Sequence, residues 1–270
     1  MSDEKKAPAP ARPAATVVIL RDGPQGIETF MVVRHHAIDF ASGALVFPGG
    51  KVDPQDQTPD WNVLAPGAPG VPAREFLVAA ARETFEEAGL LLARRRGERD
   101  LLGHDDAARI VISDRPRLIK NEVTFADILK REELEVATDL RVHFAHWITP
   151  VPVPKRFDTQ FLLVSAPVAQ LGHHDGSESV EGIWIEPQVA LAEADAGKRT
   201  LVFATAMNLK KLAQYRTVAE TVAATRASPV VTVMPRMEKT PEGGRKLHIP
   251  AEAGYGVTEV LHETPSLPGH

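Results

Sequence analysis

Residues 82–90 are the most informative stretch of this chain and read Arg-Glu-Thr-Phe-Glu-Glu-Ala-Gly-Leu. This stretch places three carboxylates, Glu83, Glu86 and Glu87, at positions i, i+3 and i+4. In a helix that spacing puts the side chains on one face, within reach of each other. Three anions held that close repel, and the usual reason for such a cluster is a hard divalent cation that prefers oxygen ligands.

The residues around this acidic cluster predict a helix. The preceding segment consists mostly of good helix formers and contains no glycine. Leu77, Ala81, Phe85 and Ala88 follow one another at helical spacing and form an apolar stripe roughly opposite the acids. Gly89 stands where a glycine commonly ends a helix. We therefore expect one packed face and one acidic face, with a merely solvated acidic surface as the alternative.

A glycine-rich turn lies upstream of the helix. Apolar residues 45–47 predict a short strand, which Pro48, Gly49 and Gly50 end. A glycine pair allows the backbone to approach a ligand closely and lets free N–H groups point at anions. A Phe-Pro-Gly-Gly turn followed by an acidic helix is much more specific than either feature alone.

Together these features resemble the Nudix hydrolases. The Nudix box begins at a glycine, matched by Gly50, and ends in the pattern that residues 82–90 fit throughout. In the family the arginine stands fourteen positions after that glycine, whereas here the separation is 82 − 50 = 32, so about 18 residues are inserted. The box also carries a glutamate eight residues before its arginine. That position is Arg74 here, with Glu75 beside it, and neither residue is assigned the role.

The insertion itself resembles one branch of the family. It opens with an Asp…Asp-Trp segment, residues 53–61, followed by a Pro/Gly-rich stretch. The peroxisomal coenzyme A diphosphatases and their bacterial relatives interrupt the box after a similar segment. Further matches lie at residues 147–150 and 156–161, and the resemblance covers roughly residues 14 to 260. Trp61 is expected to anchor the insertion.

The pattern of elements predicts a mixed α/β protein. Alternating strands and helices suit a helix–sheet–helix sandwich, which the resemblance specifies as the Nudix-type α/β/α sandwich around a mixed sheet. We expect a disordered tail at 1–13, a Nudix domain at 14–227 with an insertion at about 54–72, and a C-terminal extension at 228–270 packed on the same domain. Besides the acidic helix, the expected strands are 16–20, 29–33, 45–47, 142–148, 157–165, 182–185 and 230–233, and the expected helices are 122–136, a short one opening at Pro187, and 204–225.

The composition is that of an ordinary globular protein. Of 270 residues, 43% are hydrophobic and 25% are charged, which allows a sizeable core. The net charge of −5 gives no electrostatic reason to expect nucleic-acid binding, and the absence of cysteine excludes disulfides and thiol chemistry. The start of the chain has no apolar signal core and no stretch reaches membrane length. We expect a cytoplasmic, bacterial protein that does not interact with membranes.

The family resemblance implies a metal-dependent hydrolase that uses Mg²⁺ or Mn²⁺. It implies Glu83 and Glu87 as the principal metal ligands and Glu86 as a further ligand or as the general base. Arg82 is expected to orient these carboxylates by ion pairing. A further carboxylate is expected from the loop at 175–184, where many Nudix enzymes carry an acidic residue: Glu178 is the first choice and Glu181 the second, with a solvated loop acid as the alternative.

Substrate contacts are expected from cations and from the glycine turn. The resemblance implies that Arg34 faces the glycine turn and meets a phosphate, and Lys51 and Arg156 are similar candidates, although each of the three is equally consistent with ordinary surface charge. Gly49 and Gly50 would bring the backbone against the substrate, and Asp158 would either contact it or fix its own loop. The histidine pairs at 35–36 and 173–174 do not predict a metal site, because neighbouring side chains on a strand point to opposite faces.

The substrate is predicted only as a class, a small-molecule nucleoside diphosphate derivative. The branch resemblance favours coenzyme A or an acyl-coenzyme A, cut into 3′,5′-ADP and a phosphopantetheine. The upstream pattern of coenzyme A enzymes is matched at Arg34, Gly43 and residues 47–50, but His35 and Asp39 replace a serine and a second arginine. The alternatives are ADP-ribose, NADH or another dinucleotide, and a non-catalytic nucleotide-binding module, against which the intact acidic cluster argues. A homodimer is compatible with all of them.

Overall fold

A single long strand organises the molecule. In a computed structural model that describes residues 9–33, 44–67, 72–167, 170, 182–241 and 244–262, strand β1 (Ala11–Asp22) runs through the middle of a mixed sheet. Residues 14–20 of β1 are almost all buried, so both of its faces are covered. Such a continuous apolar run is typical of a strand packed on both sides.

The large sheet has the strand order β10-β7-β8-β1-β2-β3, with β4 paired to β1 and β9 paired to β2. The pairs β1/β8 and β10/β7 are parallel and the others are antiparallel, so the sheet is mixed, as predicted. The strands of this sheet, besides β1, are β2 (Ile27–Val33), β3 (Leu45–Val46), β4 (Gly49–Lys51), β7 (Val142–Ile148), β8 (Arg156–Ser165), β9 (Gly182–Ile185) and β10 (Thr232–Val233).

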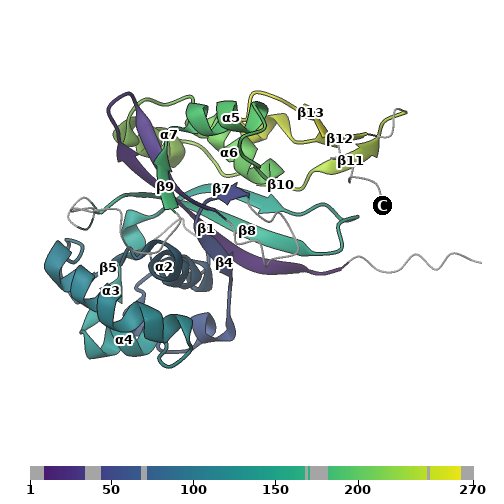
Figure 1. Cartoon of the computed structure of the whole chain (residues 1–270). Helices are drawn as coiled ribbons and strands as arrows, with labels where there is room; N and C mark the ends of the chain where they lie inside the picture. The colour runs from purple at the N-terminus through teal and green to yellow at the C-terminus, as the bar shows by residue number, and fades with distance from the viewer. Residues whose placement is uncertain are drawn as a thin grey trace, which may run out of the picture.

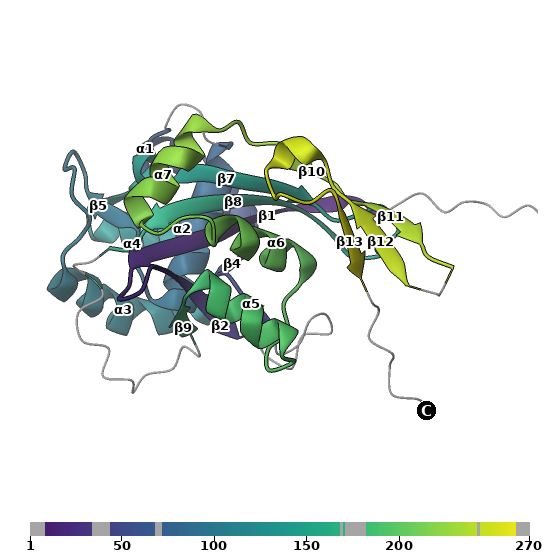
Figure 2. The same cartoon turned by 90° about the horizontal axis from the view of Figure 1, so that it is seen from above.

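Helices cover both faces of this sheet (Figure 1). On one side lie α1 (Trp61–Leu64), α2 (Arg74–Ala88), α3 (His104–Ile119) and α4 (Phe125–Arg131), with the small sheet of β5 (Ala93–Arg95) and β6 (Leu134–Val136). On the other side lie α5 (Pro187–Asp195), α6 (Phe203–Leu212) and α7 (Val218–Ala227). Seen from above, α5, α6 and α7 cross the strands of the large sheet (Figure 2). This is the predicted helix–sheet–helix sandwich.

Successive side chains of β1 point to opposite faces of the sheet and so belong to two different apolar clusters. Ala15, Val17 and Ile19 pack with residues of α2 such as Leu77, whereas Val18 and Leu20 belong to the core beneath α6. A third apolar cluster lies among α1, α2, α3 and α4. The acidic helix is therefore held against the sheet on one side and against α3 and α4 on the other.

The box insertion folds back on this third cluster. Its 3₁₀ turn, Pro54–Gln57, is followed by α1, and Trp61 of α1 is 2% exposed. The Trp61 ring packs on Phe125 with a centroid separation of 6.1 Å, and its Nε1 donates a 2.7 Å hydrogen bond to the carbonyl oxygen of Gln55. The expectation that Trp61 anchors the insertion is confirmed.

The C-terminal extension continues beyond the large sheet. After β10, the chain forms a separate antiparallel sheet of β11 (Arg236–Lys239), β12 (Arg245–His248) and β13 (Glu259–His262), which projects at one end of the molecule (Figure 2). Tyr255, between β12 and β13, is buried against Trp147 of β7. No helix among the described residues is long and apolar enough to cross a membrane.

Two of the predicted helices are wrong in extent. The helix predicted at 122–136 is α4 alone, which begins after the cap Thr124 and is followed by strand β6. Glu133 has a φ of 55°, which the helix cannot continue through. The helix predicted at 204–225 is two helices, α6 and α7, and Thr217 caps the second one by accepting a hydrogen bond from the backbone N–H of Glu220. Helix α3 was not predicted at all.

Candidate active site

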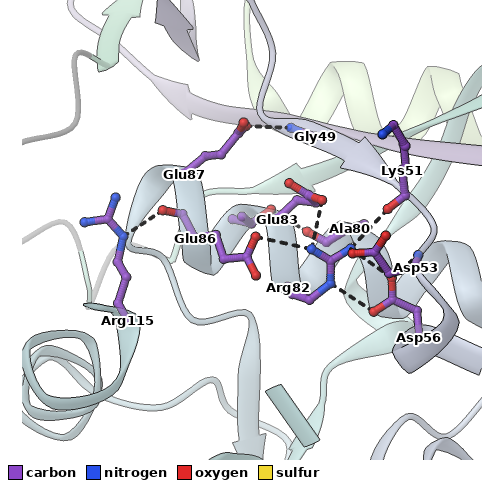
Figure 3. Close-up of polar contacts among 11 residues, drawn as sticks. Gly49, Lys51, Asp53, Asp56, Ala80, Arg82, Glu83, Glu86, Glu87 and Arg115 are labelled. Atoms are coloured by element: carbon purple, nitrogen blue, oxygen red, sulfur yellow. Dashed lines mark hydrogen bonds and ion pairs between the residues drawn. The ribbon is translucent and has the colours of Figure 1, made fainter. Parts of the chain in front are cut away.

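Helix α2 carries the acidic face and fixes where it points. Residues 79–81, all alanine, are fully buried and let the helix lie close to its neighbours. Gly89 ends the helix with a φ of 64°, the left-handed conformation that glycine adopts without strain, and its N–H donates to the carbonyl oxygen of Phe85. The predicted helix and its glycine stop are both present. Its acidic side chains face β4 and the 3₁₀ turn of the insertion (Figure 3).

The glycine pair brings the backbone of β4 against these acids. A Cβ atom on Gly50 would lie 2.3 Å from Oε1 of Glu83, and one on Gly49 would lie 2.4 Å from the carbonyl oxygen of Ala15. Neither position can accept a side chain without displacing its neighbours. The N–H of Gly49 donates a 2.9 Å hydrogen bond to Oε2 of Glu87 (Figure 3). The turn and the acidic helix, 38 residues apart in sequence here, are therefore one structural unit.

Arg82 lies at the centre of this unit and is only 2% exposed. Its Nε and Nη2 donate to the two carboxylate oxygens of Asp56 at 3.0 and 2.9 Å. Its Nη1 donates to Glu83 at 2.9 Å and to Glu86 at 3.2 Å, and Nη2 also reaches the carbonyl oxygen of Lys51 at 3.1 Å (Figure 3). These bonds fix the positions of two of the three helix carboxylates.

Asp56 is the site residue that the sequence reading missed. Its carboxylate is fully buried, and it also accepts a 2.9 Å hydrogen bond from the backbone N–H of Asp53. In the family, the box glutamate stands six positions after the first glycine, because the arginine is fourteen positions after that glycine and eight after the glutamate. Six positions after Gly50 is Asp56, so Asp56 takes the place of the box glutamate if the insertion follows it. Counting from the arginine led to Arg74, whose Nη1 instead donates to the side chain of Asn62.

Burial and mutual repulsion raise the pKa values of two of these acids. The pKa of Glu83 is raised to about 7, chiefly by burial, and the charges of Glu86 and Glu87 add to the rise while Arg82 opposes it. The pKa of Glu86 is also raised, again chiefly by burial. Burial alone would lower the pKa of Arg82, but the hydrogen bond to Asp56 and the surrounding carboxylates outweigh it, so its pKa is raised and it stays charged.

The acids of α2 suit a divalent cation in type and in charge. Their oxygens are the ligands that Mg²⁺ and Mn²⁺ prefer, and the single positive charge of Arg82 faces the carboxylates of Asp56, Glu83 and Glu86. In the conformation seen, Glu83 and Glu86 turn toward Arg82 while Glu87 turns toward Gly49. Among the described residues, no three acidic or histidine side chains converge on one ion position. A cation held by all three glutamates would require at least one of them to rotate away from its present partner.

The other predicted site residues lie apart from this network or outside the described residues. Arg156 is buried at the start of β8, where it donates to the carbonyl oxygens of Thr149 and Ala9 at 3.0 and 2.8 Å. Asp158 lies 2.5 Å from Nε2 of His146. Within the described part of the chain, no hydrogen bond or ion pair connects either residue to the acids of α2. Both residues therefore connect β8 to neighbouring segments of the sheet.

Lys51 contributes its carbonyl oxygen to Arg82, while its exposed side chain points away from that guanidinium (Figure 3). Arg34, Glu178, Glu181 and both histidine pairs lie outside the described residues. A further contact was not foreseen: Nε of Arg115, on α3, donates a 2.8 Å hydrogen bond to the backbone oxygen of Glu86.

Comparison with known proteins gives several matches to Nudix proteins. A family model described as the NUDT19 Nudix domain matches residues 71–202, which include α2 but not the glycine turn. "Putative nudix hydrolase 7" of Caenorhabditis elegans is 29% identical over 188 residues, which are 69% of this chain and 56% of that protein. The chain thus spans little more than half the length of this relative. The crystal structure of a Nudix hydrolase from Alicyclobacillus acidocaldarius matches 80% of this chain and 96% of its own, with 26% identity and a TM-score of 0.61.

Proposed function

The chain belongs to the Nudix hydrolase superfamily, and on that premise we propose that it hydrolyses the diphosphate linkage of a nucleoside diphosphate derivative with Mg²⁺ or Mn²⁺. The observation that carries this proposal is the buried Arg82, which binds Asp56, Glu83 and Glu86 together beside the glycine turn. A chain that had kept the fold and lost catalysis would have no need to bury such a costly set of charges.

The division of roles follows from position. Glu83 and Glu87 are proposed as metal ligands, and Glu86 as a further ligand or as the base that takes a proton from water. When bound, the metal ions neutralise the diphosphate and lower the pKa of the attacking water. Arg82 is a positioning residue, because its guanidinium is fully occupied by neighbouring oxygens. Glu178 and Arg34, which lie outside the described residues, remain proposed as further site residues.

The proposed substrate is coenzyme A or an acyl-coenzyme A, with release of 3′,5′-ADP. Two observations support the branch of the coenzyme A diphosphatases: the match to the NUDT19 Nudix domain model and the interrupted Nudix box. The incomplete upstream coenzyme A pattern keeps ADP-ribose and NADH as the rivals. The role proposed for Arg156 and Asp158 in substrate binding gains no support from their contacts with the strands.

A substrate panel tests the proposal directly. Purified protein would be incubated with Mg²⁺ or Mn²⁺ and coenzyme A, acetyl-coenzyme A, ADP-ribose, NADH or a diadenosine polyphosphate, and the products separated by chromatography. We expect 3′,5′-ADP from the coenzyme A compounds. Cleavage of another compound alone would replace the substrate and keep the mechanism, whereas binding without turnover of any compound would support a nucleotide-binding module instead.

A further inference from the structure

Arg115 reaches the acidic face from α3, beyond the segment that matches the Nudix box. Its Nε is fixed by a 2.8 Å hydrogen bond to the backbone oxygen of Glu86. In Figure 3 its guanidinium lies beside Glu86, on the side away from Arg82, and its other two nitrogens point away from that carbonyl. The C-terminal end of the acidic face thus has a cation of its own.

This guanidinium differs from those of its neighbours on the same helix. Arg109 pairs with Glu132 at 2.5 Å, and Arg117 pairs with Asp114 at 3.2 Å. Arg115 is partly buried, yet no described carboxylate lies within ion-pair distance and its two Nη groups have no hydrogen-bond partner among the described residues. A guanidinium has five N–H donors, and the four on the two Nη groups of Arg115 therefore remain available to a ligand.

Helix capping explains only part of this arrangement. A cation near a helix C-terminus can bind a free carbonyl and interacts favourably with the helix dipole. That role uses Nε alone and would be served by a single donor. The two Nη groups form the planar fork that matches two oxygens of a phosphate, and the bond to the Glu86 carbonyl fixes this fork at the C-terminal end of the helix that carries the carboxylates.

We propose that Arg115 binds non-bridging oxygens of the substrate diphosphate through its two Nη groups while its Nε remains on the Glu86 carbonyl. The inference rests on the proposed function, since the anion it binds is the diphosphate cleaved beside Glu86 and Glu87. Negative phosphate must approach a cluster of carboxylates, and a fixed cation at this end of α2 offsets that repulsion. Arg82 cannot do so, because its donors are already used within the protein.

Binding of methylenediphosphonate, a diphosphate analogue whose bridge resists hydrolysis, tests this role without requiring turnover. Isothermal titration in the presence of Mg²⁺ would compare the wild type with Arg115→Gln and Arg115→Lys. Arg117→Gln is the matched control, because it removes the same charge from the same helix while Arg131 remains paired with Asp114. We expect Arg115→Gln to weaken binding by about tenfold or more, Arg115→Lys to weaken it less, and Arg117→Gln to leave it unchanged.

The outcomes separate this role from helix capping and from failure of the proposed function. Unchanged affinity in Arg115→Gln would overturn the role of Arg115 while leaving the proposed function standing. Equal losses in the glutamine and lysine variants, accompanied by equal losses of thermal stability, would identify a capping residue only. No binding by the wild type would overturn the diphosphate site itself. In turnover of the substrate found in the panel, Arg115→Gln should raise KM more than it lowers kcat.

Discussion

The two faces of the central sheet bury different kinds of polar side chain, charged on one face and neutral on the other. Beneath β1, the α2 side buries Arg82 and Asp56 among carboxylates that repel one another. On the opposite side, Trp147, Tyr255 and Asn208 form a neutral chain, in which Nε1 of Trp147 donates to the Tyr255 hydroxyl at 2.7 Å and that hydroxyl donates to Asn208 at 2.9 Å. The first arrangement costs stability unless every charge is matched. The first arrangement lies at the proposed active site, and the second lies on the opposite face of the sheet.

Glu87→Gln should give the largest effect and should act on activity alone. The Glu87 carboxylate accepts from the N–H of Gly49, and a glutamine can keep that hydrogen bond through its amide oxygen. We expect turnover to fall by about a hundredfold or more because a charged ligand is lost, with the melting temperature little changed. Turnover at the wild-type level with Mg²⁺ in this variant and in Glu86→Gln would contradict the assignment of the site.

Asp56→Asn should affect both activity and stability. It removes the bidentate partner of a buried guanidinium, which typically costs about 3–5 kcal/mol, and it frees Arg82 to draw Glu83 and Glu86 out of position. Urea unfolding and steady-state kinetics measure the two effects. Asp53→Asn is the control, since that half-exposed carboxylate lies 3.6 Å from Arg82 and its loss should cost less than about 1 kcal/mol. Equal costs for the two variants would mean that Asp56 has no special role.

The metal-free protein should become less stable as the pH rises toward neutrality. The folded-state pKa of Glu83, about 7, lies above its ordinary value of 4.5. Its contribution to stability is therefore fully present below pH 4.5 and is lost as the pH rises through 7, by up to about 3 kcal/mol. Thermal unfolding in EDTA should show this decline, Glu83→Gln should reduce it, and Mg²⁺ should stabilise the wild type increasingly across the same range. A decline of equal size in Glu83→Gln would rule out this residue as its source.

Tyr255→Phe on the opposite face should give the smallest effect. It leaves the Trp147 N–H and the Asn208 amide oxygen without their buried partner, at a cost of about 1–3 kcal/mol. We expect a lower melting temperature and unchanged kcat and KM below that temperature. A loss of turnover larger than the loss of folded protein would show that the two faces are coupled more closely than their contacts indicate.

The sequence predicted the parts of the molecule that local patterns determine. The apolar stripe and Gly89 located α2, and the strands expected at 16–20, 29–33, 142–148 and 157–165 coincide with β1, β2, β7 and β8. The separation of α6 from α7 depends on a cap at Thr217, and the end of α4 depends on a positive φ at Glu133, signals too short to outweigh a long run of helix formers.

The candidate site was predictable where its residues share one helix and less so where the fold brings distant segments together. Glu83, Glu86 and Glu87 follow from helical spacing alone. Asp56 was hidden by the insertion, although counting from Gly50 would have found it. Arg115 could not be found from the sequence, because its position depends on how α3 packs against α2.

Titration with Mn²⁺, followed by electron paramagnetic resonance, tests most directly whether the acidic face of α2 is a metal-dependent hydrolytic site. The wild type should bind Mn²⁺ and show turnover that rises with the bound metal. Glu83→Gln and Glu87→Gln should lose both binding and turnover while remaining folded. Undiminished Mn²⁺ binding and turnover in these two variants would contradict the account.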